Sequence, residues 1–308
     1  MINDLQAHAP VLGVAHSDPG FALSAGACDC HVHVFDPARF PLAARRTYTP
    51  ATATVADLTQ FLDGLGLSRV VLVQPSPYGT DNRLLLSALA ELGSRARGVA
   101  VIDRHFTAGD LRGMHAAGVR GARLNLETYG DADPGVIEKL LTQTAEQIGA
   151  LGWHIQIHAR LPLVAAIAPV LAQLPTLVVL DHFAYAATDL DREREARDIV
   201  LGLMTSGKVY VKLSAAHRIG VTDDGEGATP LARALIAANP GRVLWGSDWP
   251  HTGSGPRAHR DPARIEPFEP IDDGLALHRL ARWTSAHERA QILVGNPAAL
   301  YDFAEPSR

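Results

Sequence analysis

At 308 residues, with 47% hydrophobic and 20% charged side chains, the chain has the composition of a globular protein with one large domain or two smaller ones. Its net charge of −5 and its lack of a basic run argue against nucleic acid as a partner. No apolar stretch reaches the roughly 20 residues that cross a bilayer, so no membrane partner is expected.

Neither an export signal nor a disulfide is expected. Residues 1–24 contain the acidic Asp4 and lack a charged segment followed by an apolar one. Cys28 and Cys30 are the only cysteines. Two residues apart on a strand, they point to the same side and are poorly placed to pair. These features predict a reduced, cytoplasmic setting.

From residue 28 onward, short β-branched runs alternate with longer patterns rich in alanine and leucine, which are typical of helices. Thr54 and Asp81 are candidate caps at the starts of two helices. The predicted strands are 28–34, 69–74, 97–102, 120–125, 153–158, 176–182, 208–214 and 242–248, and the predicted helices are 54–65, 82–93, 107–117, 134–151, 162–173, 192–206, 228–239 and 271–293.

Eight strands, each followed by a helix, in about 280 residues predict a single-domain (β/α)8 TIM barrel over residues 28–308, after an N-terminal extension over residues 1–27. A doubly wound sheet is the alternative. That fold normally has a glycine-rich phosphate turn after its first strand, where this chain has His31 and His33. Residues 250–270 follow the last strand closely and are interpreted as a long active-site loop.

Histidines and a carboxylate collect where the predicted strands end. His31 and His33 share one face of the first strand, whereas His158, His182 and Asp248 end the fifth, sixth and eighth strands. In a barrel, functional groups gather at the C-terminal ends of the strands. Such a set can hold Zn²⁺, or the imidazoles can donate hydrogen bonds to a substrate while the carboxylate accepts a proton from water. Packing or capping of His182, and an arginine partner for Asp248, are the structural alternatives.

Two arginines predict an acidic substrate. Arg123 and Asn125 share the inward face of the fourth strand, and Arg218 follows the seventh. Arginine matches a carboxylate in a bidentate fork, although a surface position is the alternative for Arg218. Further hydrogen bonds to the substrate are expected from polar residues after the first, second and eighth strands: Tyr48, Ser76, Tyr78 and His251.

These residues resemble a known family. His31-Val32-His33, His182, the GSDWPH segment around Asp248 and the closing segment 295–301 are similar to the amidohydrolase superfamily. More narrowly, they resemble the amidohydrolase-2 group, which contains pyrone-dicarboxylate and sugar-acid lactonases. Segments 40–50 and 74–82 add to the likeness, which covers about residues 28 to 303.

The resemblance implies a (β/α)8 barrel that opens a small, carboxylate-bearing lactone by hydrolysis. Asp248 matches the base that activates water, and Arg123 and Arg218 match arginines that hold substrate carboxylates. Ser76 and His251 match positions that line the pocket. The histidines that match those around the reacting carbonyl are His31, His33 and His182.

Two departures from the family pattern concern metal. Superfamily members with two metals carry a bridging lysine or glutamate at strand four, where this chain has Arg123 and Asn125, so at most one ion is expected. Strand five ends in His158, where the metal-free dicarboxylate lactonase has tyrosine. Metal-independent catalysis and a single divalent ion, such as Zn²⁺, both remain open. The candidate ligands are His31, His33, His158, His182 and Asp248.

Other reactions are possible on the same barrel. Lactone isomerisation would use an internal hydroxyl in place of water and release no proton. Non-oxidative decarboxylation would release carbon dioxide and usually requires a firmly bound metal. A barrel that only binds an organic acid is the alternative outside catalysis, and the presence of Asp248 together with the His31–His33 pair argues against it.

Overall fold

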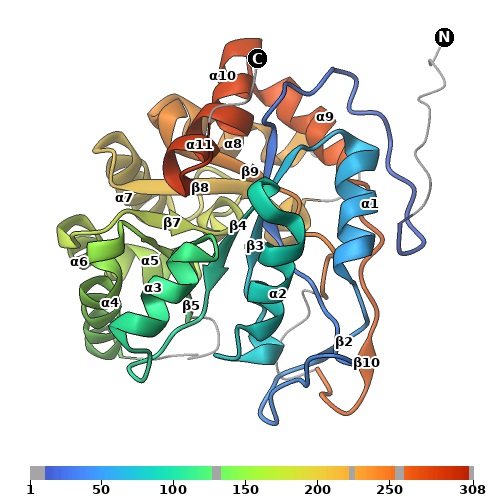
Figure 1. Ribbon diagram of the computed structural model, residues 1–308. Helices are drawn as coiled ribbons and strands as arrows, with labels where there is room; N and C mark the ends of the chain where they lie inside the picture. Colours follow the sequence, from blue (N-terminus) through green and yellow to red (C-terminus); the bar gives the residue numbers. More distant parts are fainter. Residues whose placement is uncertain (1–10, 127–132, 222–225, 254–259, 305–308) are drawn as a thin grey trace.

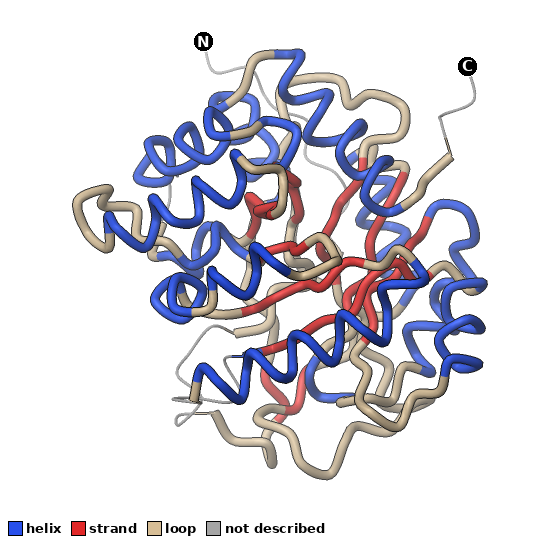
Figure 2. The backbone as a smooth tube through the Cα atoms, turned by 90° about the vertical axis from the view of Figure 1, so that its left-hand side faces the viewer, coloured by secondary structure: helices blue, strands red, loops and turns tan. Residues whose placement is uncertain are grey.

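In the computed structural model, eight parallel strands form a barrel surrounded by helices (Figure 1 and Figure 2). The structure describes residues 11–126, 133–221, 226–253 and 260–304. Each strand pairs with the next one along the chain, and the last meets the first because Val32 bridges Trp249 in parallel. The barrel strands are β1 (Cys28–Val32), β3 (Arg69–Val73), β4 (Ala96–Ala100), β5 (Val119–Asn125), β6 (His154–His158), β7 (Val178–Leu180), β8 (Val209–Ser214) and β9 (Val243–Gly246).

The barrel and all eight predicted strands are confirmed, and the helices lie near their predicted places. The helices are α1 (Val55–Leu65), α2 (Arg83–Leu92), α3 (Ala108–Ala116), α4 (Pro134–Ile148), α5 (Leu161–Ala166), α6 (Ala168–Gln173), α7 (Arg194–Thr205), α8 (Thr229–Ala238), α9 (Asp273–Trp283), α10 (Ala286–Ala290) and α11 (Asn296–Tyr301), with a π-helical turn, η10 (Gln291–Gly295), before α11.

Local sequence signals explain how several helices begin and end. Thr54 caps α1 in a capping box with Asp57, as predicted. The predicted cap at Asp81 is wrong, because Asn82 occupies the cap position and Asp81 pairs with the Arg83 side chain instead. The predicted helix over 162–173 is two helices, α5 and α6. Pro169, in the first turn of α6, cannot continue the preceding helix because its ring replaces the N–H.

The predicted helix over 271–293 is also interrupted. Helix α9 ends at Trp283, and Ser285 starts α10 with a capping box to Glu288. The predicted loop over 250–270 contains a strand that was not expected, β10 (Ile265–Glu266), which pairs in parallel with β2 (Thr49–Pro50). This small sheet ties the loop after β9 to the segment after β1, on the side of the barrel where the strands end (Figure 1).

The floor of the barrel is apolar. Inward side chains of the strands, among them Cys28, Val71 and Val99, form one buried cluster with Tyr301 of α11. Cys28 and Cys30 are both free, as expected. Among the described helices, none combines the length and the apolar character needed to cross a membrane.

Candidate active site

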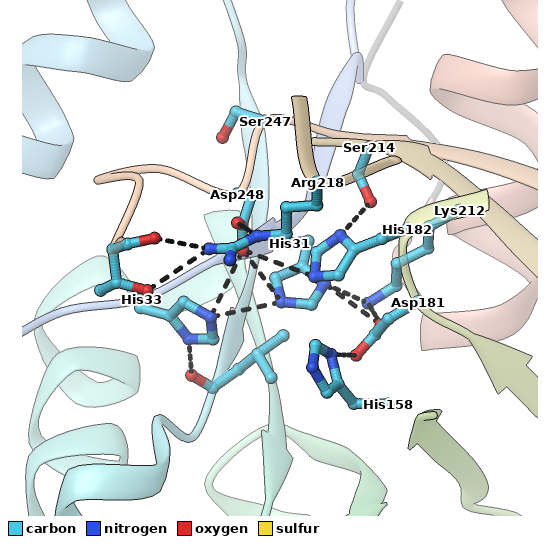
Figure 3. Close-up of polar contacts among 12 residues, drawn as sticks. His31, His33, His158, Asp181, His182, Lys212, Ser214, Arg218, Ser247 and Asp248 are labelled. Carbon is cyan, nitrogen blue, oxygen red and sulfur yellow. Dashed lines mark hydrogen bonds and ion pairs between the residues drawn. The ribbon is translucent and has the colours of Figure 1, made fainter. Parts of the chain in front are cut away.

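Asp248 lies at the centre of the predicted site, directly after β9. Its Oδ1 lies 3.6 Å from Nε2 of His31, 3.6 Å from Nε2 of His33 and 3.8 Å from Nε2 of His182 (Figure 3). All four residues are at least nine-tenths buried. The structure thus brings together all four predicted catalytic residues, from β1 and the residue directly after it, the segment after β7 and the segment after β9.

Close packing of β1 against β9 positions His31. A Cβ atom on Gly246 would lie 2.8 Å from Cβ of His31, so glycine allows this approach. Asp29 then joins the two strands, because its Oδ1 accepts the backbone N–H groups of His31 and Ser247, each at 3.0 Å. Burial raises the pKa of Asp29 to about 7 despite these hydrogen bonds. Sequence reasoning did not identify this linking residue.

Arg218 holds Asp248 in its charged form. Burial alone would raise the pKa of the Asp248 carboxyl, but the Arg218 guanidinium keeps it well below its usual range. Arg218 Nε donates to Asp248 Oδ2 at 2.7 Å, and its Nη2 donates to the backbone oxygen of Thr252 at 2.8 Å. Asp248 also has a φ of 74°, a left-handed conformation that aspartate adopts more readily than most residues. Its Oδ1 is consequently left facing the histidines.

Each histidine has a second partner that orients its ring. His33 Nδ1 donates to the backbone oxygen of Val73 at 2.7 Å, and His182 Nδ1 lies 2.9 Å from Oγ of Ser214. Burial lowers the pKa of His31 to about 3 and also lowers that of His182, so both rings are uncharged near neutral pH.

A second carboxylate, Asp181, lies below the first. Its Oδ1 lies 3.2 Å from His31 Nδ1 and 3.4 Å from Lys212 Nζ, and its Oδ2 lies 3.6 Å from Arg123 Nη2. Burial would raise the pKa of Asp181, but His31 and Lys212 hold it well below the usual range. Sequence reasoning missed Lys212. The sequence does contain a signal for it. Lys212 interrupts an apolar strand and shares a strand face with Tyr210 and Ser214.

The predicted residue His158 also joins this group. Its Nδ1 lies 3.9 Å from Asp181 Oδ2, and its Nε2 lies 3.3 Å from the Tyr185 hydroxyl. Burial lowers the pKa of His158 to about 3. His158 therefore groups with Asp181 and His182 as a possible metal ligand, and it does not group with Asp248.

His251 is held from behind by a carboxylate on α9. Its Nε2 lies 2.8 Å from Asp273 Oδ2, and a possible ligand atom of the ring lies within 4.8 Å of those of Asp248 and His217. Burial works against its charged form, but Asp273 raises the pKa of His251 above its usual value. Sequence reasoning missed Asp273, because it lies 22 residues further along the chain on a different element.

A cavity of about 850 Å³, a size that suits a small organic ligand, is lined by Arg123, whose guanidinium also lies 3.6 Å from Asp181. Three predicted substrate-binding residues line it: Arg123, Ser76 and Asn125. Tyr48 is buried next to Ser76, under the guanidinium of Arg260. The structure uses Tyr78 differently, because its hydroxyl accepts the backbone N–H of Asp36 at 2.9 Å.

The donor atoms around Asp248 could hold one divalent ion. Bonds of about 2.0–2.2 Å place the ligand atoms of a tetrahedral zinc site about 3.3–3.6 Å apart. Asp248 Oδ1 lies 3.6–3.8 Å from its three imidazole nitrogens, and the Nε2 atoms of His31 and His33 are 3.3 Å apart. His31, His182 and Asp248 offer ligand atoms that all lie within 4.8 Å of one another.

Comparison with known proteins gives consistent matches over nearly the whole chain. The family described as amidohydrolase matches residues 28–303. A 2-pyrone-4,6-dicarboxylate hydrolase of Comamonas testosteroni is 35% identical over 92% of this chain and 93% of its own length. A 4-sulfomuconolactone hydrolase of Rhizobium radiobacter is 34% identical, over 93% and 94%. A Pseudomonas putida crystal structure, provisionally described as a 2-pyrone-4,6-dicarboxylic acid hydrolase, has a TM-score of 0.75 at 32% identity, over 91% and 99%.

Proposed function

The chain belongs to the amidohydrolase family, and we propose that it hydrolyses a small lactone that carries a carboxylate. The observation that carries this proposal is the arrangement of Asp248, an ionised carboxylate whose Oδ1 faces three imidazole Nε2 atoms at 3.6–3.8 Å. Such a carboxylate can accept a proton from water, and the imidazoles beside it can polarise a carbonyl group. The two hydrolases similar in sequence support a lactone as the substrate.

In the proposed reaction, Asp248 accepts a proton from water as the water oxygen bonds to the carbonyl carbon of the lactone. The histidines His31, His33 and His182 surround the carbonyl oxygen, where negative charge develops. The intermediate then collapses, the ring C–O bond breaks, and the leaving oxygen takes the proton from Asp248. The product is a hydroxy acid, whose new carboxyl group ionises and releases a proton.

A single divalent ion would be held by His31, His182 and Asp248, with His33 and His158 beside them. Bound there, it would act as a Lewis acid toward the carbonyl and lower the pKa of water. The protein also contributes fixed charges of its own, because Lys212 and Arg123 pair with Asp181 below the histidines. We propose zinc as the ion that these nitrogen and oxygen donors favour.

We propose that Arg123 binds the substrate carboxylate. Its guanidinium lines the cavity, and its contacts within the protein are long, at 3.4 Å to the Gln74 backbone oxygen and 3.6 Å to Asp181. Ser76 and Asn125 add hydrogen bonds from the same cavity. Arg218, by contrast, already donates to Asp248, so its first role is to keep that carboxylate charged and oriented.

The Arg123→Lys substitution is expected to raise KM for an acidic lactone about tenfold and to change kcat much less. A lysine keeps the charge but cannot form the two parallel hydrogen bonds of a guanidinium. Steady-state kinetics measure the effect. The matched control is Arg120→Lys, on the same strand, because Arg120 pairs with Asp302 outside the site. Equal KM values for the two variants would remove Arg123 from the substrate site.

We also propose that residues 28–308 form the one domain that carries the activity and that residues 1–27 are an extension, whose described part from residue 11 onward packs on the domain. In support, Ser17 donates its backbone N–H to Asp272 at 2.9 Å, and His16 accepts the N–H of Asp273 at 3.1 Å. The extension therefore contacts the start of α9, the helix whose Asp273 holds His251.

A screen of acidic lactones with a pH indicator tests the proposed hydrolysis. We expect proton release from at least one carboxylate-bearing lactone and none from neutral lactones of the same ring size. The screen is run on chelator-treated protein and on protein supplemented with zinc, together with metal analysis. An isomerase would convert the lactone without releasing a proton, and that result would contradict the proposal.

A further inference from the structure

The N-terminal extension (residues 1–27) lies against the first turn of α9. Its described part, dark blue in Figure 1, runs past α1 and α9. Ser17 donates its backbone N–H to Asp272 Oδ1 at 2.9 Å and its hydroxyl to Asp272 Oδ2 at 2.5 Å. Further along the helix, His278 Nδ1 lies 3.2 Å from the backbone oxygen of Pro19. The extension is therefore fixed to α9 at two successive points.

A glycine in the first turn of α9 allows this contact. A Cβ atom on Gly274 would lie 1.6 Å from the backbone oxygen of Ser17, so any other residue would displace the extension. A backbone approach this close is open only to glycine. Glycine is otherwise one of the weakest helix formers. Gly274 therefore weakens the helix by itself but lets the extension lie directly on it.

His16 joins the extension to the active site. Its Nδ1 accepts the backbone N–H of Asp273 at 3.1 Å and lies 3.8 Å from Asp273 Oδ2. Both side chains are almost completely buried. The His16 ring also lies edge-on to Phe61 of α1, at 5.2 Å between centroids, and Phe61 stacks on Trp249 at 5.5 Å. His16 thus supports two residues that pack against the segment after β9.

Asp273 in turn holds the ring of His251. Its Oδ2 lies 2.8 Å from His251 Nε2, and both residues are buried. His251 has a φ of 68°, a left-handed conformation that costs a non-glycine residue free energy. Such a conformation persists only where the surroundings hold it. The carboxylate of Asp273 provides part of that support.

The other ring nitrogen of His251 is placed to contact a substrate. Nδ1 is buried and has no hydrogen-bond partner among the described residues. A possible ligand atom of the ring lies within 4.8 Å of those of Asp248 and His217. A buried polar atom without a partner is costly. A polar group of a substrate bound beside Asp248 would supply the missing hydrogen bond.

We infer that Asp273 is a positioning residue, which turns Nδ1 of His251 toward the substrate, and that the N-terminal extension holds Asp273 in place. The inference rests on the proposed hydrolysis, because the lactone is the substrate that His251 would contact. Residues 16 and 17, although they precede the barrel, then belong to the support of the active site. An extension that only stabilised the fold would change the melting temperature and leave KM unchanged.

The Gly274→Ala variant of the full-length protein tests the inference, because its methyl group would push Ser17 away from α9. We expect KM for the lactone to rise about tenfold, as for loss of one substrate hydrogen bond, with a much smaller change in kcat. The matched control is Gly202→Ala on α7, where a Cβ atom would meet no neighbouring atom within 4 Å. Its KM should equal that of the wild type. An unchanged KM in Gly274→Ala would overturn the inference.

A second background shows whether the effect passes through His251. The His251→Phe variant keeps a ring in the site but removes both nitrogens. In this background Gly274→Ala should raise KM little further, since the interaction that it disturbs is already absent. A merely structural role would raise KM by the same factor in both backgrounds, and that result would contradict the inference.

The Ser17→Ala variant provides a milder test should Gly274→Ala fail to fold. It removes one half-buried hydroxyl from Asp272 and should raise KM about threefold, again only where His251 is present. The control is Ser206→Ala, which loses a hydroxyl bonded to the backbone oxygen of Leu203 at 2.8 Å. Equal KM values for the two variants would also overturn the inference.

Amide hydrogen exchange separates failure of this inference from failure of the proposed function, because it needs no substrate. The backbone N–H of His251 donates to the Asp248 oxygen at 2.9 Å, and that of Glu269 donates to the His251 oxygen at 2.8 Å. We expect both to exchange faster in Gly274→Ala. If exchange rises only within residues 11–27 and α9, the extension does not hold His251 and the inference fails. Faster exchange at His251 together with a negative lactone screen would contradict the proposed function alone.

Discussion

The Asp248→Asn variant is expected to lose at least about 1,000-fold in kcat toward the lactone, because an amide cannot accept a proton from water. Both carboxylates of the site are ionised, but only Asp248 has an oxygen facing three imidazoles at 3.6–3.8 Å. The other, Asp181, is enclosed by Lys212, Arg123 and His31. Loss of Asp248 should therefore remove the general base and leave substrate binding through Arg123 largely intact.

Two controls separate a chemical defect from a structural one. Asparagine keeps the shape of Asp248 and can still accept the hydrogen bond of Arg218, so the circular dichroism spectrum should match that of the wild type. The Asp63→Asn variant removes a surface carboxylate that pairs with Arg95 and should keep full activity. If Asp248→Asn turned over the lactone at a rate near that of the wild type, Asp248 could not be the base.

Much of the fold follows from the period-2 and period-3.6 patterns of the sequence. The β-branched runs identified every barrel strand, because both faces of a parallel strand are buried in this fold. Interruptions of helices were harder to predict. The break between α5 and α6 depends on Pro169 within an otherwise regular apolar pattern, and the pairing of β2 with β10 joins residues that are 216 positions apart in the sequence.

The site was only partly predictable, because some of its contacts also join segments that are far apart in the sequence. Residues at strand ends converge in any barrel, so His31, His33, His182 and Asp248 could be placed together from their positions alone. The residues that support them could not be predicted in this way. Asp273 comes from α9, and whether Asp29 points toward β9 depends on how closely Gly246 lets the two strands pack.

Sequence position also could not show what each arginine does. Arg123 and Arg218 were both assigned to substrate carboxylates, on the grounds that each lies near the mouth of the barrel. In the structure, Arg218 donates at 2.7 Å to Asp248, whereas Arg123 contacts its protein partners only at 3.4 Å or more. Arg218 lies in the short turn after β8, Ala216–Ile219, from which its guanidinium donates to both Asp248 and the backbone of Thr252.

Acid is expected to destabilise the folded protein steeply below neutral pH, because three buried histidines resist protonation. Burial lowers the pKa of His31, His154 and His158 from 6.5 to about 3. In the unfolded chain these rings take up protons as the pH falls through 6.5, whereas the folded protein does not. The free energy of unfolding should therefore fall by up to about 1.4 kcal/mol per pH unit for each ring.

One buried carboxyl works in the opposite direction. The pKa of Asp29 is raised to about 7, so its protonation favours the folded state as the pH falls toward 3.8. One group of this sign does not offset three of the other, and we expect the melting temperature to drop by about 10 °C or more between about pH 6.5 and about pH 4.5.

The His154→Phe variant, which keeps an aromatic ring against Tyr301, should show a shallower drop than the wild type. Replacement of the exposed His105 should leave the dependence of the melting temperature on pH as in the wild type. If the wild type and both variants showed the same dependence, buried histidines would not control acid stability.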